Sequence, residues 1–302
     1  MERKNPIYRS KIEFVNSNGF PPTICIQLLK WCNLKCAYCR AGSSPFEKER
    51  LSFAEVSELL IKLNTFGKWR ISLTGGEPFY WPELTALLEL IDELAFPFSV
   101  TTNAFASIEP LSLIPSRLWK NATLYVSIDG NRKTHDGIRG EGSFDKAIDF
   151  LRFARPVVPK LFVNTVLFTD PQLWAAELYE LLNAANVNNW TIISPVKAGR
   201  WPQGAVQLAD YRSGYNRINQ IVNGFNGKTT TSFLDFAEAE GAYEDVVFIN
   251  SDGKIRLPGF YQEESHSNNF PLVSEFSIND GDAALRIYES VDHFLSTQQF
   301  MR

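Results

Sequence analysis

The stretch LKWCNLKCAYC, residues 29–39, contains three of the four cysteines in this chain of 302 residues. Cys32, Cys36 and Cys39 have the spacing CxxxCxxC, and they follow an apolar run, residues 23–29 (TICIQLL), that is typical of a buried strand. Three thiolates on one short loop can bind three irons of a 4Fe-4S cube, whose usual complement is four cysteines. The fourth iron would then stay open to a substrate or cofactor, as one position of a catalytic zinc site does.

Two other uses of these cysteines are open at this point. Zinc sites usually take four ligands, often as two separated pairs, and the chain has no second pair. A disulfide framework is poorly served by an odd cluster of three cysteines. The remaining cysteine, Cys25, lies within the predicted strand, and we expect it to be a small buried apolar residue. The number of ligands therefore favours the iron-sulfur cluster over zinc or inert thiols.

Length and composition exclude several classes of protein. A chain of 302 residues can form one large α/β domain, or a domain with an appendage, around a substantial core. Its net charge of -4 and its scattered lysines and arginines argue against nucleic acid as a partner. No run approaches the roughly 18 apolar residues of a membrane span, and the N-terminus lacks the apolar core of a signal peptide. We therefore expect a cytoplasmic protein without a membrane partner, in a compartment where cysteines stay reduced.

A second motif follows the next predicted strand, residues 69–74. It is Gly75-Gly76-Glu77-Pro78. Two glycines allow positive φ and a close approach of the backbone to a ligand. The carboxylate of Glu77 can receive an ammonium group, and Pro78 stiffens the exit from the turn. By itself a Gly-Gly-Glu-Pro turn is common, but its position about 40 residues after CxxxCxxC makes it highly specific.

Strands and helices alternate along residues 22–196. A helix is expected from the capping box of Ser52 and Glu55 to Leu63, and further helices are expected over residues 82–94 and 171–182. The expected strands are residues 22–29, 69–74, 98–102, 124–128, 160–167 and 190–193. This alternation predicts a parallel sheet with right-handed crossovers.

The CxxxCxxC motif, with Gly-Gly-Glu-Pro about 40 residues later, resembles the radical S-adenosylmethionine (SAM) superfamily. The resemblance implies one 4Fe-4S cluster on Cys32, Cys36 and Cys39, with the amino and carboxylate groups of SAM on the fourth iron. One electron from the reduced cluster would cleave SAM to methionine and a 5'-deoxyadenosyl radical, which removes a hydrogen atom from the substrate. The implied fold is α/β, a partial (β/α)6 TIM-like barrel over residues 22–196 with a small α+β C-terminal extension. The implied electron donor is a protein such as flavodoxin or ferredoxin.

A narrower resemblance comes from residues 126–130 (VSIDG), 135–140 (HDGIRG) and 142–144 (GSF). Together they look like the peptide-modifying and sulfatase-maturing branch of the superfamily. The resemblance implies that Ser127 and Arg139 contact the carboxylate or the ribose of SAM. Arginine suits this role because its planar fork binds a carboxylate through two hydrogen bonds. A solvated surface arginine is the alternative.

Polar residues at the ends of successive strands are further candidates for contacts with SAM. Barrel folds place their chemistry at the C-terminal ends of the strands, while helix capping and turn formation are the other common roles of such residues. His135 and Asp136 are expected to cap or brace their loop. In the GGEP motif, the resemblance implies that Glu77 binds the methionine amino group. The full set of candidate SAM contacts is Tyr38, Gly75, Gly76, Glu77, Pro78, Thr102, Asn103, Ser127, Asp129, Arg139, Asn164, Ser194 and Pro195.

The remaining segments are a lead-in, residues 1–21, and a C-terminal extension, residues 197–302. Residues 11–15 of the lead-in can form an edge strand. In the extension, we expect a loop over residues 197–204 that can close over the barrel mouth. Helices are expected over residues 211–225 and 282–296, and a hairpin is expected whose strands, residues 244–250 and 254–257, flank the turn Ser251-Asp252-Gly253.

This hairpin marks a departure from the relatives that share the motifs. Their C-terminal extension, called SPASM, carries auxiliary iron-sulfur clusters on several cysteines, one of them just beyond a hairpin with an Asp-Gly turn. Here Pro258 stands at that position, and no cysteine follows Cys39. We therefore expect no Cys-ligated auxiliary cluster. In an oxidative reaction the substrate radical must lose an electron, and the auxiliary cluster is its usual acceptor. The absence of that cluster therefore favours redox-neutral reactions.

Three functions follow from these motifs. The first is a radical SAM enzyme acting on a small molecule, such as a sugar or nucleoside-type natural product. The second is a radical SAM enzyme that modifies a ribosomally made precursor peptide or a protein side chain. The narrower resemblance favours the peptide, while the absent auxiliary clusters and the lack of an N-terminal peptide-recognition domain favour the small molecule. The third is a non-catalytic descendant that binds SAM or a partner protein.

Overall fold

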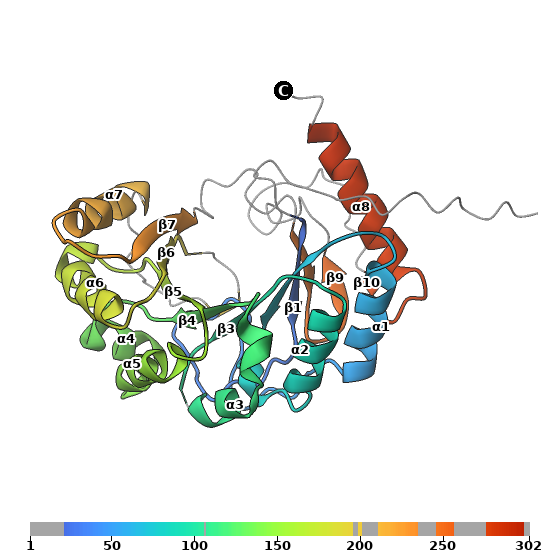
Figure 1. Cartoon of the computed structure of the whole chain (residues 1–302), viewed down its shortest axis with the longest axis horizontal. Coiled ribbons are helices and arrows are strands. Elements are labelled where there is room, and N and C mark those ends of the chain that lie inside the picture. The colour runs from blue at the N-terminus through green and yellow to red at the C-terminus, as the bar shows by residue number, and fades with distance from the viewer. Residues whose placement is uncertain are drawn as a thin grey trace, which may run out of the picture.

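The architecture is one curved, mostly parallel sheet with a layer of helices on its outer side (Figure 1). The computed structural model describes residues 21–105, 107–195, 199–200, 211–234, 246–256 and 276–298. In these residues, ten strands form a single sheet in the order β10-β9-β8-β1-β2-β3-β4-β5-β6-β7. The strands are β1 (Thr23–Gln27), β2 (Arg70–Thr74), β3 (Phe98–Thr102), β4 (Thr123–Ser127), β5 (Lys160–Val166), β6 (Asn189–Ile193), β7 (Thr230–Leu234), β8 (Val246–Ile249), β9 (Lys254–Arg256) and β10 (Phe276–Ser277).

Helices follow most of the strands. The α-helices are α1 (Phe53–Leu63), α2 (Leu84–Glu93), α3 (Ile108–Leu113), α4 (Arg132–Arg139), α5 (Ser143–Ala154), α6 (Ala175–Ala184), α7 (Tyr211–Val222) and α8 (Ala283–Gln298). The short 3-10 helices are η1 (Pro78–Tyr80), η2 (Ser116–Trp119) and η3 (Pro171–Leu173). Figure 1 shows α1, α2, α3, α5 and α6 along the outer side of the arc.

The six strands expected from the sequence are all present, and each pairs in parallel with the next. The prediction of an α/β partial barrel is therefore confirmed. The C-terminal residues extend the same sheet at both edges, because β7 pairs in parallel with β6 and β8 pairs in parallel with β1. Strand β7 was not expected.

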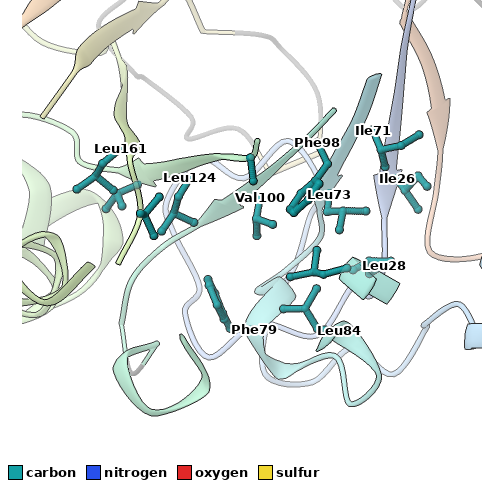
Figure 2. Packing of buried hydrophobic residues seen from close by; sticks show 14 of the residues in the cluster. Ile26, Leu28, Ile71, Leu73, Phe79, Leu84, Phe98, Val100, Leu124 and Leu161 are labelled. Atoms are coloured by element: carbon teal, nitrogen blue, oxygen red, sulfur yellow. The ribbon is translucent and has the colours of Figure 1, made fainter. Parts of the chain in front are cut away.

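Alternating burial along the strands separates the two faces of the sheet. In β1, Ile24 and Ile26 are fully buried, whereas Thr23, Cys25 and Gln27 are only partly buried. Figure 2 shows buried side chains of neighbouring strands, among them those of Ile26, Leu73 and Val100, in one apolar layer. Cys25, which was expected to be buried, is only partly buried, because it lies on the other face of β1 with Thr23 and Gln27.

Helix α1 shows why this layer forms where it does. The hydroxyl of Ser52 accepts a hydrogen bond from the Glu55 backbone N–H, and the Glu55 carboxylate accepts one from the Ser52 N–H, so the capping box is confirmed. The buried side chains of the helix are Val56, Leu59, Leu60 and Leu63. Burying each of these stabilises the fold by about 1.5–3 kcal/mol. Together they fix α1 against the sheet.

Most of the elements expected in the C-terminal extension are present in the structure. Helices α7 and α8 and the hairpin of β8 and β9 are present, and Gly253 takes the positive φ of 80° that the hairpin turn needs. The possible edge strand at residues 11–15 and Pro258 lie outside the described residues, as does most of the loop at 197–204. In the part of the chain that the structure describes, no helix has the length and apolar character needed to cross a membrane.

Candidate active site

The cysteine loop lies against the ends of β2 and β3. Cys32 is buried, and its sulfur is within hydrogen-bonding distance of two N–H donors, Leu34 N and Asn103 Nδ2, both at 3.4 Å. The sulfur of Cys39 is 3.3 Å from the backbone N–H of Ser43. Hydrogen bonds to the sulfurs are among the features that set the properties of an iron-sulfur cluster. Thus the donors around these two sulfurs suit thiolate ligands.

The free thiols resist ionisation. Burial raises the pKa of Cys32 to about 12 and also raises the pKa of Cys36. A buried thiolate is therefore unfavourable until a metal compensates its charge. Among the described residues, no three His, Cys, Asp or Glu side chains are arranged to hold a single metal ion. In a 4Fe-4S cube each thiolate binds its own iron, so three cysteines of one loop can be ligands without meeting at a single ion.

Glu77 is the acidic group next to this loop, and its side chain is fully buried. Its carboxylate accepts hydrogen bonds from the Thr102 hydroxyl at 2.8 Å, from the Asn103 backbone N–H at 2.8 Å and from the Phe79 N–H at 3.3 Å. Burial nevertheless raises the pKa of Glu77 to about 7. Within the described part of the chain, it forms no ion pair with a basic side chain. A buried carboxylate in this position is suited to receive an ammonium group.

The two glycines before Glu77 serve a different purpose from the expected one. Neither Gly75 nor Gly76 has a positive φ, so that part of the prediction is wrong. Gly76 N donates to Leu29 O at 2.7 Å, and Glu77 N donates to Trp31 O at 3.1 Å. A Cβ on Gly76 would lie 1.8 Å from Trp31 O. The glycines are required because the turn packs against the chain that leads into Cys32.

We expect Gly76→Ala to destabilise the protein by about 3 kcal/mol, because the added methyl group meets backbone atoms that have no room to move. The same change should loosen the cysteine loop and lower its iron content. Gly137→Ala is the matched control, since a Cβ there meets nothing within 4 Å and the φ of Gly137 is not positive. This variant should be stabilised by about 0.5–1 kcal/mol. Urea unfolding of both variants measures the difference, and equal stabilities would contradict the prediction.

Tyr38, Asp129 and Arg139 form a partly buried hydrogen-bond network. The Tyr38 hydroxyl and Arg139 Nε both donate to Asp129 Oδ2 at 2.5 Å, and Val166 N donates to Asp129 Oδ1 at 2.9 Å. The side chains of Arg139 and Asp129 are only 10% and 1% exposed, so Arg139 is not a solvated surface residue. Burial raises the pKa of Tyr38 well above its usual value and keeps the hydroxyl a donor. The Tyr38 ring stacks on the ring of Phe168 with centroids 4.1 Å apart.

His135 and Asp136 brace this network, as expected, although the segment forms helix α4 rather than a loop. His135 Nδ1 accepts a hydrogen bond from Asp129 N at 3.0 Å, and burial lowers the pKa of His135 to about 4, so the ring stays neutral. The Asp136 carboxylate accepts from the N–H groups of Phe144 and Gly142, at 2.8 and 3.1 Å. Asp136 therefore caps the start of α5.

Ser127 and Asn164 are neighbours on β4 and β5. The Oδ1 atom of Asn164 is buried and has no hydrogen-bond partner among the described residues. An acceptor left in this state costs about 1–3 kcal/mol, so it suits a ligand that brings a donor, such as a sugar hydroxyl. Ser194 and Pro195 are buried at the end of β6, where Ser194 N donates to Leu234 O of β7 at 3.0 Å.

The structure also shows residues of the site that the sequence analysis did not single out. Ala37 N donates to Ile138 O of α4 at 2.8 Å, which ties the cysteine loop to the Arg139 side of the site. On the opposite side, Arg200 pairs with Cys39 as an isolated antiparallel bridge. Asn33 Nδ2 donates to Phe105 O. These contacts join segments far apart in the sequence, and no local pattern marks them.

The family model described as the radical SAM superfamily matches residues 26–182. This chain therefore belongs to the radical SAM superfamily, whose members are enzymes that use a 4Fe-4S cluster and SAM. The match includes the cysteine loop, Gly-Gly-Glu-Pro and Arg139.

Several known proteins are similar to this chain. Pre-heme d1 synthase of Dinoroseobacter shibae is 25% identical over 241 residues, which are 78% of this chain and 57% of that protein. Sporulation killing factor maturation protein SkfB of Bacillus subtilis is 30% identical over 152 residues, 49% of this chain and 37% of that protein. The chain thus spans about half the length, or less, of these curated relatives. The crystal structure of Streptococcus suis SuiB bound to precursor peptide SuiA shares the fold, with a TM-score of 0.69 and 18% identity over 89% of this chain and 65% of SuiB.

Proposed function

We propose that Cys32, Cys36 and Cys39 hold the 4Fe-4S cluster and that the surrounding residues bind SAM for hydrogen abstraction from a substrate. When bound and reduced by an external donor, the cluster would supply one electron for the reductive cleavage of SAM. The observation that carries the proposal is the hydrogen-bonded chain from Cys32 through Asn103 to Glu77, which links the cysteine loop to a buried carboxylate.

Different residues of the site are proposed to bind different parts of SAM. Glu77 Oε2 accepts one hydrogen bond, from Asn103 N, so it retains a lone pair for the ammonium group of SAM. Arg139 and Ser127 are proposed to contact its carboxylate or ribose. The unpartnered Oδ1 of Asn164 is proposed to accept from a ribose hydroxyl. Burial around these groups excludes water from the radical reaction.

Asp129 is proposed to act through its neighbours rather than by contacting SAM directly. Its Oδ2 is shared by Tyr38 and Arg139, and its Oδ1 accepts from Val166 N. It thereby fixes the phenol ring and the guanidinium group in the positions from which they can contact the cofactor. Gly75, Gly76, Pro78 and Thr102 shape the turn that carries Glu77, and Ser194 and Pro195 remain candidate contacts at the end of β6.

The proposed substrate is a small molecule, and the proposed reaction is redox-neutral. Two observations support this choice. Pro258 stands just beyond the hairpin of β8 and β9, where the relatives with an auxiliary cluster have a cysteine, and similar proteins include pre-heme d1 synthase and an AdoMet-dependent heme synthase of Methanosarcina barkeri. A sugar or nucleoside-type natural product remains the proposed class. The enzyme would act in the reducing cytoplasm with a donor such as flavodoxin or ferredoxin.

A peptide substrate is the second candidate. It is favoured by the similarity to sporulation killing factor maturation protein SkfB and by the fold shared with SuiB, which has been solved with the precursor peptide SuiA. The two candidates can be separated with a deuterated cell extract that is divided into a small-molecule and a peptide fraction. Deuterium should appear in deoxyadenosine only with the small-molecule fraction. Transfer from the peptide fraction alone would replace the first candidate with the second.

The test of the chemistry itself is the metal content and the reaction of the reconstituted protein. After anaerobic reconstitution, we expect about four irons and four sulfides per chain, as one cube requires. With SAM and a strong reductant, the protein should release deoxyadenosine. Zinc in place of iron would contradict the proposal. A full, reducible cluster without deoxyadenosine would instead support a non-catalytic descendant that binds SAM or a partner protein.

A further inference from the structure

Residues Gly199 and Arg200 lie against the cysteine loop, although more than 150 residues separate them from it in the sequence. Arg200 N donates to Cys39 O at 2.8 Å, and Cys39 N donates to Arg200 O at 2.9 Å. Arg200 thus binds both backbone groups of Cys39, one of the proposed iron ligands, and the Cys39 carbonyl also accepts a hydrogen bond from Gly42 N. The loop is thereby tied to the segment that follows β6.

The side chain of Arg200 adds two more bonds to the same loop. Nε donates to Cys36 O and Nη2 donates to Ser43 O, each at 2.7 Å. Hydrogen bonds from a charged donor are about twice as strong as neutral ones. Because Cys36 and Ser43 lie on either side of Cys39, one guanidinium group holds both ends of the segment that carries this cysteine.

Gly199 makes this approach possible. Its φ is +63°, and a Cβ there would lie 2.2 Å from Arg40 O and 2.3 Å from Cys39 O. Both the backbone conformation and the lack of space therefore require glycine at this position. The backbone of Gly199 therefore packs directly against the backbone of Cys39 and Arg40, and no side chain would fit between them.

The loop is also held by α4. Ala37 N donates to Ile138 O at 2.8 Å, and the next residue, Arg139, is bound to Asp129 through its Nε. The cysteine loop is thus held by two segments that are distant from it in the sequence, residues 199–200 and helix α4.

We propose that Gly199 and Arg200 form a clamp that keeps the cysteine loop in its cluster-binding conformation, and that Arg200 is a positioning residue for Cys36 and Cys39. The inference rests on the proposed function, since it takes Cys36 and Cys39 as iron ligands. Arg200 has two effects in this clamp. The planar guanidinium group fixes the positions of Cys36 O and Ser43 O, and its positive charge favours the reduced, more negative cluster.

Two variants separate these effects. Arg200→Lys keeps the charge but cannot bind Cys36 O and Ser43 O together, and Arg200→Met loses both properties. Iron release from the reconstituted protein to a chelator should be about tenfold faster in both variants. The midpoint potential of the cluster should become more negative in Arg200→Met and change little in Arg200→Lys. Arg152→Met, which removes an exposed arginine of α5, is the control and should match the wild type in both measurements.

Hydrogen exchange provides a readout that does not depend on iron. Exchange of the peptide covering residues 36–43 should be faster in both Arg200 variants, while peptides of β3 and β4 should be unchanged. Iron release and exchange at wild-type rates in both variants would overturn the clamp, and so would an equal acceleration of exchange throughout the sheet. If the wild type binds no iron but the exchange result holds, the proposed function fails while the clamp stands.

Discussion

Cys36→Ala is expected to lose most of its iron and to form no detectable deoxyadenosine from SAM. The three thiolates of the loop each hold one iron in the proposed cluster, so removing one leaves two irons of the cube without a protein ligand. The backbone of residue 36 should keep its place in the variant, because its carbonyl is held by Arg200 and Ala37 N is held by Ile138 O. Loss of iron would then reflect the missing sulfur rather than an unfolded loop.

Cys25→Ala is the matched control for this experiment. Cys25 lies on the partly buried face of β1, opposite Ser72 and Phe248 in the sheet, and burial raises the pKa of its thiol. It is therefore a protonated thiol outside the cysteine loop, and its removal should leave the iron content unchanged. Iron and sulfide analysis and deoxyadenosine assays on both variants provide the measurement. Retained turnover in Cys36→Ala would exclude the proposed cluster.

The sheet could be predicted from the sequence because its strands carry strong local signals. The strands that were expected have β-branched or aromatic residues and end at polar turns, and the capping box of Ser52 and Glu55 marked α1. Strand β7 has the sequence TTSFL and a half-exposed pattern without clear alternation, so periodicity did not mark it. Helix α4 contains one buried side chain, that of His135, so it lacks the apolar stripe that predicts a helix.

The candidate site was predictable only in part, for a related reason. Motif spacing indicated the cysteines and Glu77, because these residues lie in short contiguous patterns. It did not indicate that Asp129 accepts hydrogen bonds from Tyr38 and Arg139, or that Arg200 binds the cysteine loop. These contacts depend on how the ends of distant strands meet in space. A residue type at a strand end shows that a polar group is present, but its partner is decided by the packing.

Glu77→Gln is expected to stabilise the SAM-free protein at neutral pH. Burial raises the pKa of Glu77 from 4.5 to about 7, so the folded protein holds this proton more tightly than the unfolded chain. Between these two pH values the folded state binds more protons, and the stability contributed by this group falls as the pH rises. Above pH 7 the buried charge of Glu77 lowers the free energy of unfolding by its full cost of about 3 kcal/mol. Glutamine cannot ionise, so the variant does not carry this cost.

The neighbours of Glu77 can accommodate the amide. Asn103 N can still donate to the amide oxygen, and the Thr102 hydroxyl can turn to accept from the new NH2 group. Only the long bond from Phe79 N, at 3.3 Å, is lost, and this loss is the same at every pH. The stability difference between Glu77→Gln and the wild type should therefore grow by about 3 kcal/mol from pH 4.5 to pH 8 and then level off. Urea unfolding of the reconstituted, SAM-free proteins at a series of pH values measures it. Parallel pH profiles for the two proteins would contradict the raised pKa.

The same variant should bind SAM at least about tenfold more weakly, because a charged hydrogen bond to the ammonium group contributes about 1.5–3 kcal/mol. Glu58→Gln, on the exposed surface of α1, is the control and should bind SAM with wild-type affinity. A variant that is more stable but binds SAM poorly would show that Glu77 is kept for the ligand at the expense of the fold. A less stable variant that binds SAM normally would make Glu77 a brace between β2 and β3, and the ammonium site would have to lie elsewhere.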